Sequence, residues 1–441
     1  MRNFSGQFKR IAGPAAVMAA ASIGAGSASS LILSGAWFRY ELLWAALLVV
    51  PLLVITVDSA SRIGLLNKNK GMFSLICEHL HPGVAWLLLA INIPVHLLIS
   101  MGQMSVMTSA ALSLFEIYPP DTAAEFADSN YQTVELVASL VFAAGIVWLL
   151  TSEGYQRMQR FMTAFLLLMF TCFLVVAVRG FIELPAILSG LAPGVPADLP
   201  VPGQDMVRSS GIVIMGIVGS VLAPAAMLGM PYMSADNRQN EAVDLRHEFR
   251  NSIINLGFIH GACSLCIIIA GGFALYPLAN HAEIDSVHEA GRILLRAFPQ
   301  GLEFLGPVIF SAGMLIAALT TFIVTVEIIT YFILDMFGYA WHHTRDNLRF
   351  KRTVAVCIIL PAVLAPLWTF PALFKLLLLM GINAIVVPLV YLAVLILINK
   401  KSVMGEHTGG IARNLTLLAA LIFSLTISVI KMPDFVRALL G

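Results

Sequence analysis

Long apolar segments separated by short polar connections run through almost the whole chain. A helix needs about 20 apolar residues to cross the hydrocarbon core of a bilayer, and by that measure the pattern predicts eleven membrane-spanning helices. The predicted spans are residues 11–37, 41–66, 83–113, 132–151, 159–181, 209–234, 251–277, 304–336, 353–369, 374–398 and 412–432. The expected fold class is therefore an all-α polytopic membrane protein with about 11 transmembrane helices.

Two of these segments are interrupted by residues that favour a break in a helix. The first has glycines and serines at its midpoint, in the stretch ASIGAGSASS at residues 21–30. The sixth contains Ala223-Pro224-Ala225 and then Gly229-Met230-Pro231, and proline removes a backbone donor from a helix. Interrupted helices in matching positions of two halves are typical of inverted-repeat transporters, whose binding site lies at the bilayer midplane between the breaks.

This pattern predicts a single transporter domain over residues 1–441, built as an inverted 5+5 repeat with broken helices 1 and 6. The first repeat is expected at about 11–181 and the second at about 209–398, with an extra helix at 412–432. A proline-containing connection at 182–208 separates the two halves.

Composition supports a membrane protein and narrows its partners. Hydrophobic residues make up 59% of the chain and charged residues only 12%, whereas about a quarter of a soluble domain is charged. A net charge of +1 provides no basic surface for nucleic acid, and no segment contains a nucleophile–base pair or a cluster of metal ligands. The expected partners are the lipid bilayer and a small-molecule substrate, with no obligate protein partner, no cofactor beyond a coupling Na⁺ or H⁺, and no enzymatic activity.

Basic residues predict the orientation, because lysine and arginine are enriched in cytoplasmic loops. With the N-terminus inside, 18 of the 26 Lys and Arg residues fall on the cytoplasmic side. The loop at 116–128, which is then outside, carries four acidic residues and no basic one. We therefore expect a multi-pass protein of the cell membrane with a cytoplasmic N-terminus and an external C-terminus.

Several short stretches resemble one family. They are Gly13-Pro14, Gly35-Ala36, Leu42-Leu43-Trp44, Arg62-Ile63-Gly64 and the segment at 70–82. In these stretches the chain resembles the Nramp divalent-metal transporters, over roughly the first 110 residues and again around the sixth span. The resemblance implies a leucine-transporter-type fold and secondary active transport.

The positions that bind metal in that family differ here. The family's metal-binding Asp falls on Gly24, its Asn on Ser27, and the Met of its span-6 motif on Ala223. Transition metals need His, Cys, Met or carboxylate donors, and hard cations need several oxygens. These three residues supply one hydroxyl and backbone carbonyls, so no metal site is expected, nor transport of Mn²⁺ or Fe²⁺.

The same break could instead hold an anion. The second half of a broken helix begins with unpaired backbone N–H groups, and its dipole attracts negative charge there. The Gly-Ala-Gly at 24–26 is similar to the Gly-x-Gly break with which amino-acid transporters of this fold hold a substrate carboxylate, and the serines at 27–30 add hydroxyl donors. The predicted substrate-binding residues are Gly24, Ala25, Gly26, Ser27, Ala223, Ala225 and, in span 10, Asn383.

Coupling candidates come from spans 3 and 8. Ala317, Thr320 and Thr321 resemble the sodium site of sodium-coupled members of the fold. Ionisable residues deep in a membrane are costly and usually functional, which makes His96 and Glu327 candidate proton carriers. Asp58 and Asp335 lie near the ends of predicted helices, where we expect them to be solvated.

The sequence therefore favours an Nramp-like secondary active transporter for a small organic solute that bears a carboxylate, driven by Na⁺ or H⁺. The alternative is a divalent-cation transporter of altered selectivity, for example one that binds Mg²⁺ through its water shell. A non-transporting sensor built on the same fold would usually need an appended signalling domain, and the sequence has no candidate for one.

Overall fold

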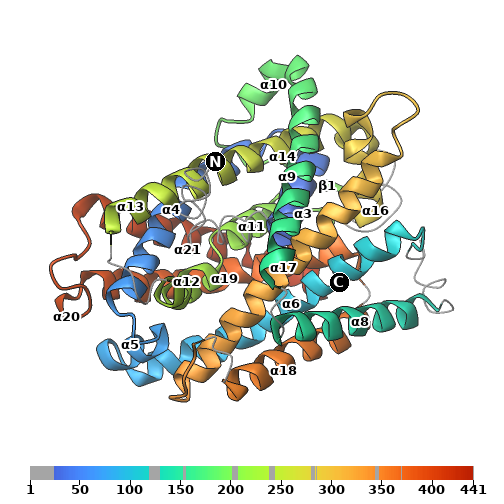
Figure 1. The fold of residues 1–441 in the computed structure, drawn as a ribbon. Coiled ribbons are helices and arrows are strands. Elements are labelled where there is room, and N and C mark those ends of the chain that lie inside the picture. The colour runs from blue at the N-terminus through green and yellow to red at the C-terminus, as the bar shows by residue number, and fades with distance from the viewer. Residues whose placement is uncertain are drawn as a thin grey trace, which may run out of the picture.

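The computed structural model describes residues 24–118, 130–151, 155–200, 207–237, 244–279, 284, 286–342, 347–368 and 370–440. Nearly all of the described chain is helical, and its long helices pack into one bundle (Figure 1). The long elements of the first half are α3 (Ala25–Phe38), α4 (Leu43–Leu66), α6 (Pro82–Leu114), α8 (Tyr131–Thr151) and α9 (Tyr155–Gly180). Those of the second half are α11 (Ser210–Val221), α12 (Pro224–Asn237), α13 (Leu245–Ser252), the π-helix η2 (Ile253–His260), α14 (Gly261–Ala274), α17 (Leu305–Met336), α18 (Leu348–Leu364), α19 (Ala372–Asn399) and α21 (Ile411–Leu440).

Short elements connect these helices. They are α5 (Met72–His79), η1 (Phe181–Glu183), α10 (Leu184–Ser189), α15 (Tyr276–Ala279), α16 (Val287–Gly291), η3 (Arg292–Ala297), η4 (Ala365–Leu367) and α20 (Lys401–Met404). Two strands of two residues each, β1 (Leu199–Pro200) and β2 (Val207–Arg208), pair antiparallel in the connection between the two halves.

Among the described residues, ten helices are long and apolar enough to cross a membrane. They coincide with ten of the eleven spans expected from the sequence. The remaining span, the first, is represented by α3, which forms its second half. Residues 11–23, the first half of that span, lie outside the described part of the chain.

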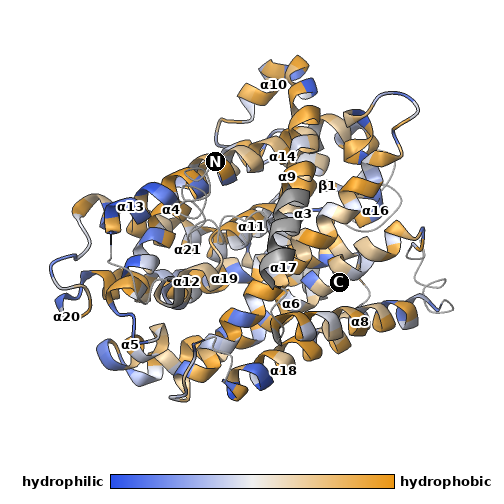
Figure 2. Cartoon of the chain, viewed as in Figure 1, coloured by the Kyte–Doolittle hydropathy of each residue, from blue (hydrophilic) through white to orange (hydrophobic). Residues whose placement is uncertain are grey.

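The apolar surface of the outer helices suits a lipid environment. Hydrophilic residues gather near helix ends, for example on α13 and beside α20, while the long helices are apolar along most of their length (Figure 2). Outer helices such as α8 and α21 leave large apolar side chains exposed, among them Trp148 and Val429. Such side chains are stable in contact with lipid, and an α-helix satisfies its own backbone hydrogen bonds there.

The centre of the bundle is formed by α3, α6, α11, α12, α17 and α19. Every residue of α3 and of α11 is buried, α6 packs along α17, and α11 packs along α19. The backbones approach closely where α11 meets α19, because a Cβ atom at Gly219 would lie 1.9 Å from the Met380 carbonyl oxygen. Only glycine permits that approach.

The sixth span has one break, where two were expected. Helix α11 ends at Val221 and α12 begins at Pro224, so the first predicted interruption is present. The second prediction, at Gly229-Met230-Pro231, is wrong, because α12 continues through Pro231. Neighbouring helices stabilise a proline in a membrane helix, and here the residues after Pro231 are bonded to them: Tyr232 donates to Asp335, and Ser234 shares a hydrogen bond with Ser61.

Asp58 and Asp335 are not solvated, contrary to expectation. Asp58 is 0% exposed, and its Oδ2 atom lies 2.7 Å from Arg62 Nε and 2.5 Å from Arg413 Nη2. Asp335 accepts hydrogen bonds from the Tyr232 hydroxyl and from Ser74. Each carboxylate is buried by helices that approach from elsewhere in the sequence, which a position near a helix end does not reveal.

Candidate functional site

The break in the sixth span is held open by a side chain from another helix. A continuous helix would bond the carbonyl of Gly219 to the amide of Ala223, but α11 ends before that residue. The Asn383 Nδ2 atom on α19 donates to this carbonyl instead, at 3.0 Å. Unpaired carbonyls at a helix end need such partners when they are buried, so Asn383 stabilises the broken conformation of α11 and α12.

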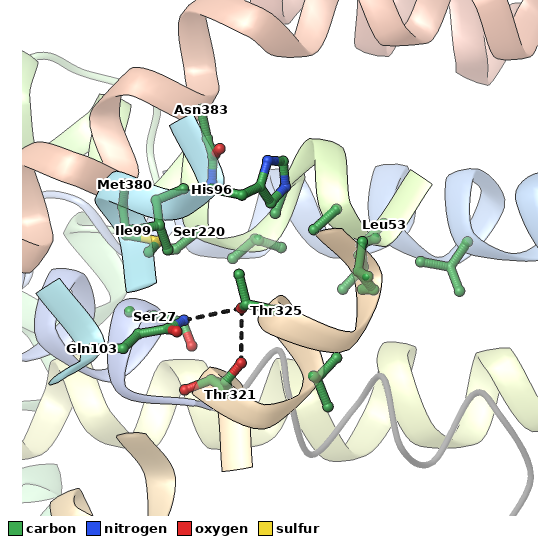
Figure 3. A pocket seen from close by; sticks show the side chains of 18 of the residues that line it. Ser27, Leu53, His96, Ile99, Gln103, Ser220, Thr321, Thr325, Met380 and Asn383 are labelled. Carbon is green, nitrogen blue, oxygen red and sulfur yellow. Dashed lines mark hydrogen bonds between the residues drawn. The ribbon is translucent and has the colours of Figure 1, made fainter. Parts of the chain in front are cut away.

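A cavity of about 70 Å³ lies beside this break (Figure 3). It is bounded by the start of α3, the α11–α12 break, the middle of α6, and the facing parts of α17 and α19. The cavity is therefore large enough for more than one water.

Three polar side chains in the cavity present an unpaired atom. His96, Gln103 and Asn383 are only 1%, 3% and 2% exposed, and all three line the cavity. His96 Nε2, Gln103 Oε1 and Asn383 Oδ1 have no hydrogen-bond partner. Buried polar atoms normally have partners, so these three mark a place for a ligand.

The chemistry of the three unpaired atoms follows from the bonds that their side chains already make. Asn383 donates one Nδ2 hydrogen to a carbonyl, and its Oδ1 atom is left without a partner. His96 Nδ1 lies 2.6 Å from the Asn92 carbonyl, which can only accept, so Nδ1 carries the proton and Nε2 has a lone pair.

The unpaired atom of Gln103 is identified from two hydrogen bonds that share the Thr325 hydroxyl. The Thr325 hydroxyl donates to the Thr321 carbonyl at 2.7 Å, so it can only accept from Gln103 Nε2 at 3.3 Å (Figure 3). Gln103 Oε1 is then the unpaired atom. In all three side chains the atom without a partner is therefore an acceptor.

The serines at the start of α3 do not supply the expected donors. The hydroxyls of Ser27, Ser29 and Ser30 donate to carbonyls one turn earlier in their own helix, those of residues 24, 25 and 26. Of these serines, only Ser27 lines the cavity. The hydroxyls that were expected to bind a carboxylate therefore already stabilise the first turns of α3.

The structure brings together most of the sequence-predicted residues. Those that line the cavity are Gly26, Ser27, Ala223, Ala225, Asn383, His96 and Thr321. Gly24 and Ala25 are buried at the start of α3 but do not line it, and neither do Ala317, Thr320 or Glu327. The Ala317 carbonyl accepts from the hydroxyls of both Thr320 and Thr321, at 2.9 and 2.7 Å.

Sequence reasoning missed Gln103 and Met380. Gln103 lies seven residues, or two helical turns, after His96 on α6, so the two polar residues share one face of an apolar helix, and that spacing could have found it. Met380 lies against Gly26, where an added Cβ would come 2.7 Å from its sulfur. Its sequence context, an apolar run in α19, gave no such signal.

The described lining of the cavity carries no formal charge. No Asp, Glu, Lys or Arg lies among its described lining residues. Within the described part of the chain, no group of three or more His, Cys, Asp or Glu side chains could hold a metal ion directly. A ligand in this cavity would meet neutral side chains of the described lining and the backbone at the start of α3 and at the α11–α12 break.

Comparison with known proteins identifies the family. The model of the natural resistance-associated macrophage protein-like (Nramp) family matches residues 15–433. The chain belongs to the Nramp family. It is therefore a multi-pass membrane transporter. No curated protein sequence matches the chain.

Solved structures define the fold of this Nramp-family chain. One similar structure is the Eremococcus coleocola manganese transporter in complex with an aromatic bis-isothiourea substituted compound. The two are 16% identical with a TM-score of 0.72, over 100% of this chain and 90% of that chain. Another is MhsT in complex with L-phenylalanine, at 12% identity and a TM-score of 0.64, over 96% and 98% of the two chains. The fold is thus of the leucine-transporter type.

Proposed function

We propose that this Nramp-family chain is a secondary transporter for a divalent cation that keeps its bound waters, with Mg²⁺ as the representative ion. The observation that carries the proposal is the set of three unpaired acceptors in the cavity, on His96, Gln103 and Asn383. Water bound to a metal ion presents its O–H groups outward, so each acceptor can receive a hydrogen bond from one such water.

Magnesium suits this arrangement better than a transition metal. Mg²⁺ gives up its waters reluctantly and is commonly bound with several of them retained. The cavity has room for more than one water, as an ion that keeps some of its waters requires. Mn²⁺ and Fe²⁺ are bound directly by carboxylate, imidazole or sulfur ligands, and the described lining offers one imidazole (His96) and one thioether (Met380) but no carboxylate.

Of the two substrates considered from the sequence, the site favours the divalent cation over the carboxylate-bearing solute. A carboxylate accepts hydrogen bonds and so needs donors, but the amide nitrogens of Gln103 and Asn383 each already donate one of their two N–H groups to a protein oxygen. The serine hydroxyls of α3 do so as well. The side-chain atoms that have no partner are acceptors, which suits a hydrated cation better than an anion.

A carboxylate-bearing solute remains the second candidate because of one observation. Gly26 and Ser27 are in the first turn of α3 and line the cavity, and the backbone N–H groups of a first helical turn have no partner within the helix. An anion bound there would use these amides alone.

The experiment is an uptake assay in proteoliposomes that contain a trapped Mg²⁺-sensitive dye. We expect saturable Mg²⁺ uptake that is inhibited by hexaamminecobalt(III), whose fixed ammine ligands imitate a hydrated ion and cannot be displaced. Mn²⁺ uptake that saturates at micromolar concentration would contradict the hydrated site. Uptake of labelled amino acids or small organic acids without any Mg²⁺ uptake would favour the second candidate.

Coupling and orientation complete the proposed function. We propose a cell-membrane location with a cytoplasmic N-terminus. Contacts between regions that are all expected on the cytoplasmic side support this orientation. Arg413 and Arg62 both bind Asp58 on α4. Lys400 donates to the His79 carbonyl. For the coupling ion, Thr321 keeps Na⁺ a candidate, since it lines the cavity beside the Ala317 carbonyl.

A further inference from the structure

Two arginines meet one buried carboxylate near the end of α4. Asp58 is 0% exposed, and its Oδ2 atom contacts both Arg62 Nε and Arg413 Nη2. The arginine side chains are themselves only 17% and 14% exposed. One carboxylate and two guanidinium groups leave these three residues, the Asp58 cluster, with an excess of one positive charge.

This excess charge calls for an anion beside the cluster. A charge that is removed from water is costly unless it is paired. Among the described residues, Asp58 is the carboxylate that pairs with either arginine. A second negative charge must therefore come from outside the described chain, and the nearest source for a membrane protein is the phosphate of a lipid.

The two guanidinium groups also keep N–H groups that the described chain does not use. Arg62 donates through Nε to Asp58 and through Nη2 to the Leu245 carbonyl. Arg413 donates through Nη1 to Ser59 Oγ at 2.7 Å, and its Nη2 contacts Asp58. Arg62 Nη1 and Arg413 Nε thus have no partner among the described residues. Guanidinium N–H groups are well suited to phosphate oxygens.

Helix α13 places two more arginines beside the cluster. Its Leu245 carbonyl binds the cluster, and the ring centre of Phe249 lies 5.9 Å from Arg413 Cζ. Arg246 and Arg250 directly follow these two residues, and both are exposed. Because they are one helical turn apart, they share one face of α13.

The acidic residues of α13 lie away from this basic face. The Asp244 carboxylate caps the helix by accepting from the backbone amides of Arg246 and His247. Glu248 is only 3% exposed, and its position two residues from Arg246 and from Arg250 directs it to the other side of the helix.

Exposed apolar side chains continue from the arginines along the membrane-spanning helices. Ile254 and Phe258 follow Arg250 at intervals of about one turn, and both are exposed. On α21, Leu415 and Ile422 are exposed as well. Both η2 and α21 pack against α4. Positive charge at a helix end, followed by an apolar surface, matches the headgroup and acyl chains of a phospholipid.

We propose that the Asp58 cluster, together with Arg246 and Arg250, binds the headgroup of an anionic phospholipid. Arg62 Nη1 and Arg413 Nε donate to the phosphate oxygens, and the acyl chains lie along η2 and α21. The lipid thereby links α4, α13 and α21. The site does not depend on which cargo the protein carries, and the proposed orientation only assigns the lipid to the cytoplasmic leaflet.

The charges at the site set the size of the expected effect. Each basic side chain near a membrane surface strengthens the binding of anionic lipid about fivefold. Arg246→Gln/Arg250→Gln should therefore weaken binding about 25-fold, while the buried cluster and the fold stay intact because both side chains are exposed. Asp58→Asn should have the opposite effect on lipid binding, since it removes a negative charge from the site.

The experiment measures the unfolding temperature of the purified full chain in nonionic detergent during titration with dioleoyl phosphatidylglycerol. A ligand that binds only the folded state raises this temperature, so the half-saturating lipid concentration reports affinity. Wild type should show a saturable rise with phosphatidylglycerol and none with dioleoyl phosphatidylcholine or inorganic phosphate. Arg246→Gln/Arg250→Gln should need about 25-fold more phosphatidylglycerol. Asp58→Asn should need less than wild type, even if it unfolds at a lower temperature without lipid.

The matched control is Arg352→Gln, which removes another exposed arginine near the start of α18 on the same expected side of the membrane. It should respond as wild type does. Three results would overturn the proposal: equal rises with both lipids, the same rise with inorganic phosphate alone, or a wild-type response in Arg246→Gln/Arg250→Gln. None of them bears on cation transport, so the proposed function would stand or fall separately.

Discussion

Replacing Gln103 by methionine should weaken transport without weakening the fold. Methionine has nearly the same length but no amide, so the cavity loses one of its three acceptors. A hydrogen bond to a charged group contributes about 1.5–3 kcal/mol, so the apparent Mg²⁺ affinity should fall about ten- to hundredfold. Thr325 loses the 3.3 Å bond from Gln103 but still donates to the Thr321 carbonyl.

The stability change has the opposite sign to that of an ordinary core substitution. The lost bond contributes about 0.5–1 kcal/mol, while an unpaired buried carbonyl costs about 1–3 kcal/mol, and Gln103→Met removes both. The free energy of unfolding should therefore stay constant or rise by up to about 2 kcal/mol.

Initial rates of Mg²⁺ uptake in proteoliposomes and thermal unfolding in detergent test both parts. Gln132→Met is the matched control, because Gln132 donates to the Pro366 carbonyl on the outer part of the bundle, away from the cavity. The control should unfold at a lower temperature with unchanged KM. Unchanged KM in Gln103→Met, or a loss of stability like that of the control, would refute the assignment of Gln103 Oε1 to the substrate.

Three further predictions concern coupling and packing. If Thr321 completes a sodium site, uptake should require Na⁺ and Thr321→Ala should weaken that requirement; equal uptake in Na⁺ and choline would exclude it. Gly64→Ala should lower the unfolding temperature, because the new Cβ would lie 2.1 Å from the Pro231 carbonyl oxygen on α12. Such overpacking costs about 1–3 kcal/mol, and a melting curve like that of wild type would argue against this contact. Asp58→Asn should lower the free energy of unfolding by about 3 kcal/mol, since it leaves two largely buried arginines without their counter-charge. Denaturant unfolding measures this change, and a decrease below about 1 kcal/mol would show that the Asp58 cluster is solvated.

The spans were predictable because hydrophobic length is a direct consequence of bilayer thickness. The break at Leu222 and Ala223 was also visible, since Pro224 cannot continue a helix by donating backward. Pro231 carries the same local signal but does not end α12. Tertiary contacts decide between these outcomes, and the bonds of Tyr232 and Ser234 to other helices are not encoded nearby in the sequence.

The candidate site was predictable in position but not in polarity. The resemblance to a transporter family placed the site between two broken helices, and the cavity lies at the start of α3 beside the α11–α12 break. The polarity depends on which atoms remain unpaired, and that depends on partners such as Gly219 and Thr325, which are more than a hundred residues away from Asn383 and Gln103.

Asn383 limits how this site can change over evolution. Its nitrogen holds the end of α11 while its oxygen is unpaired beside the cavity, so in the proposed function one side chain both maintains the break and contacts the cargo. An ionised aspartate at this position would have no donor for the Gly219 carbonyl, and a carboxylate could not be added here without disturbing the helix end. A lineage that moves from hydrated to bare metal ions must therefore acquire its negative charge at another position, such as the start of α3, while position 383 remains an amide.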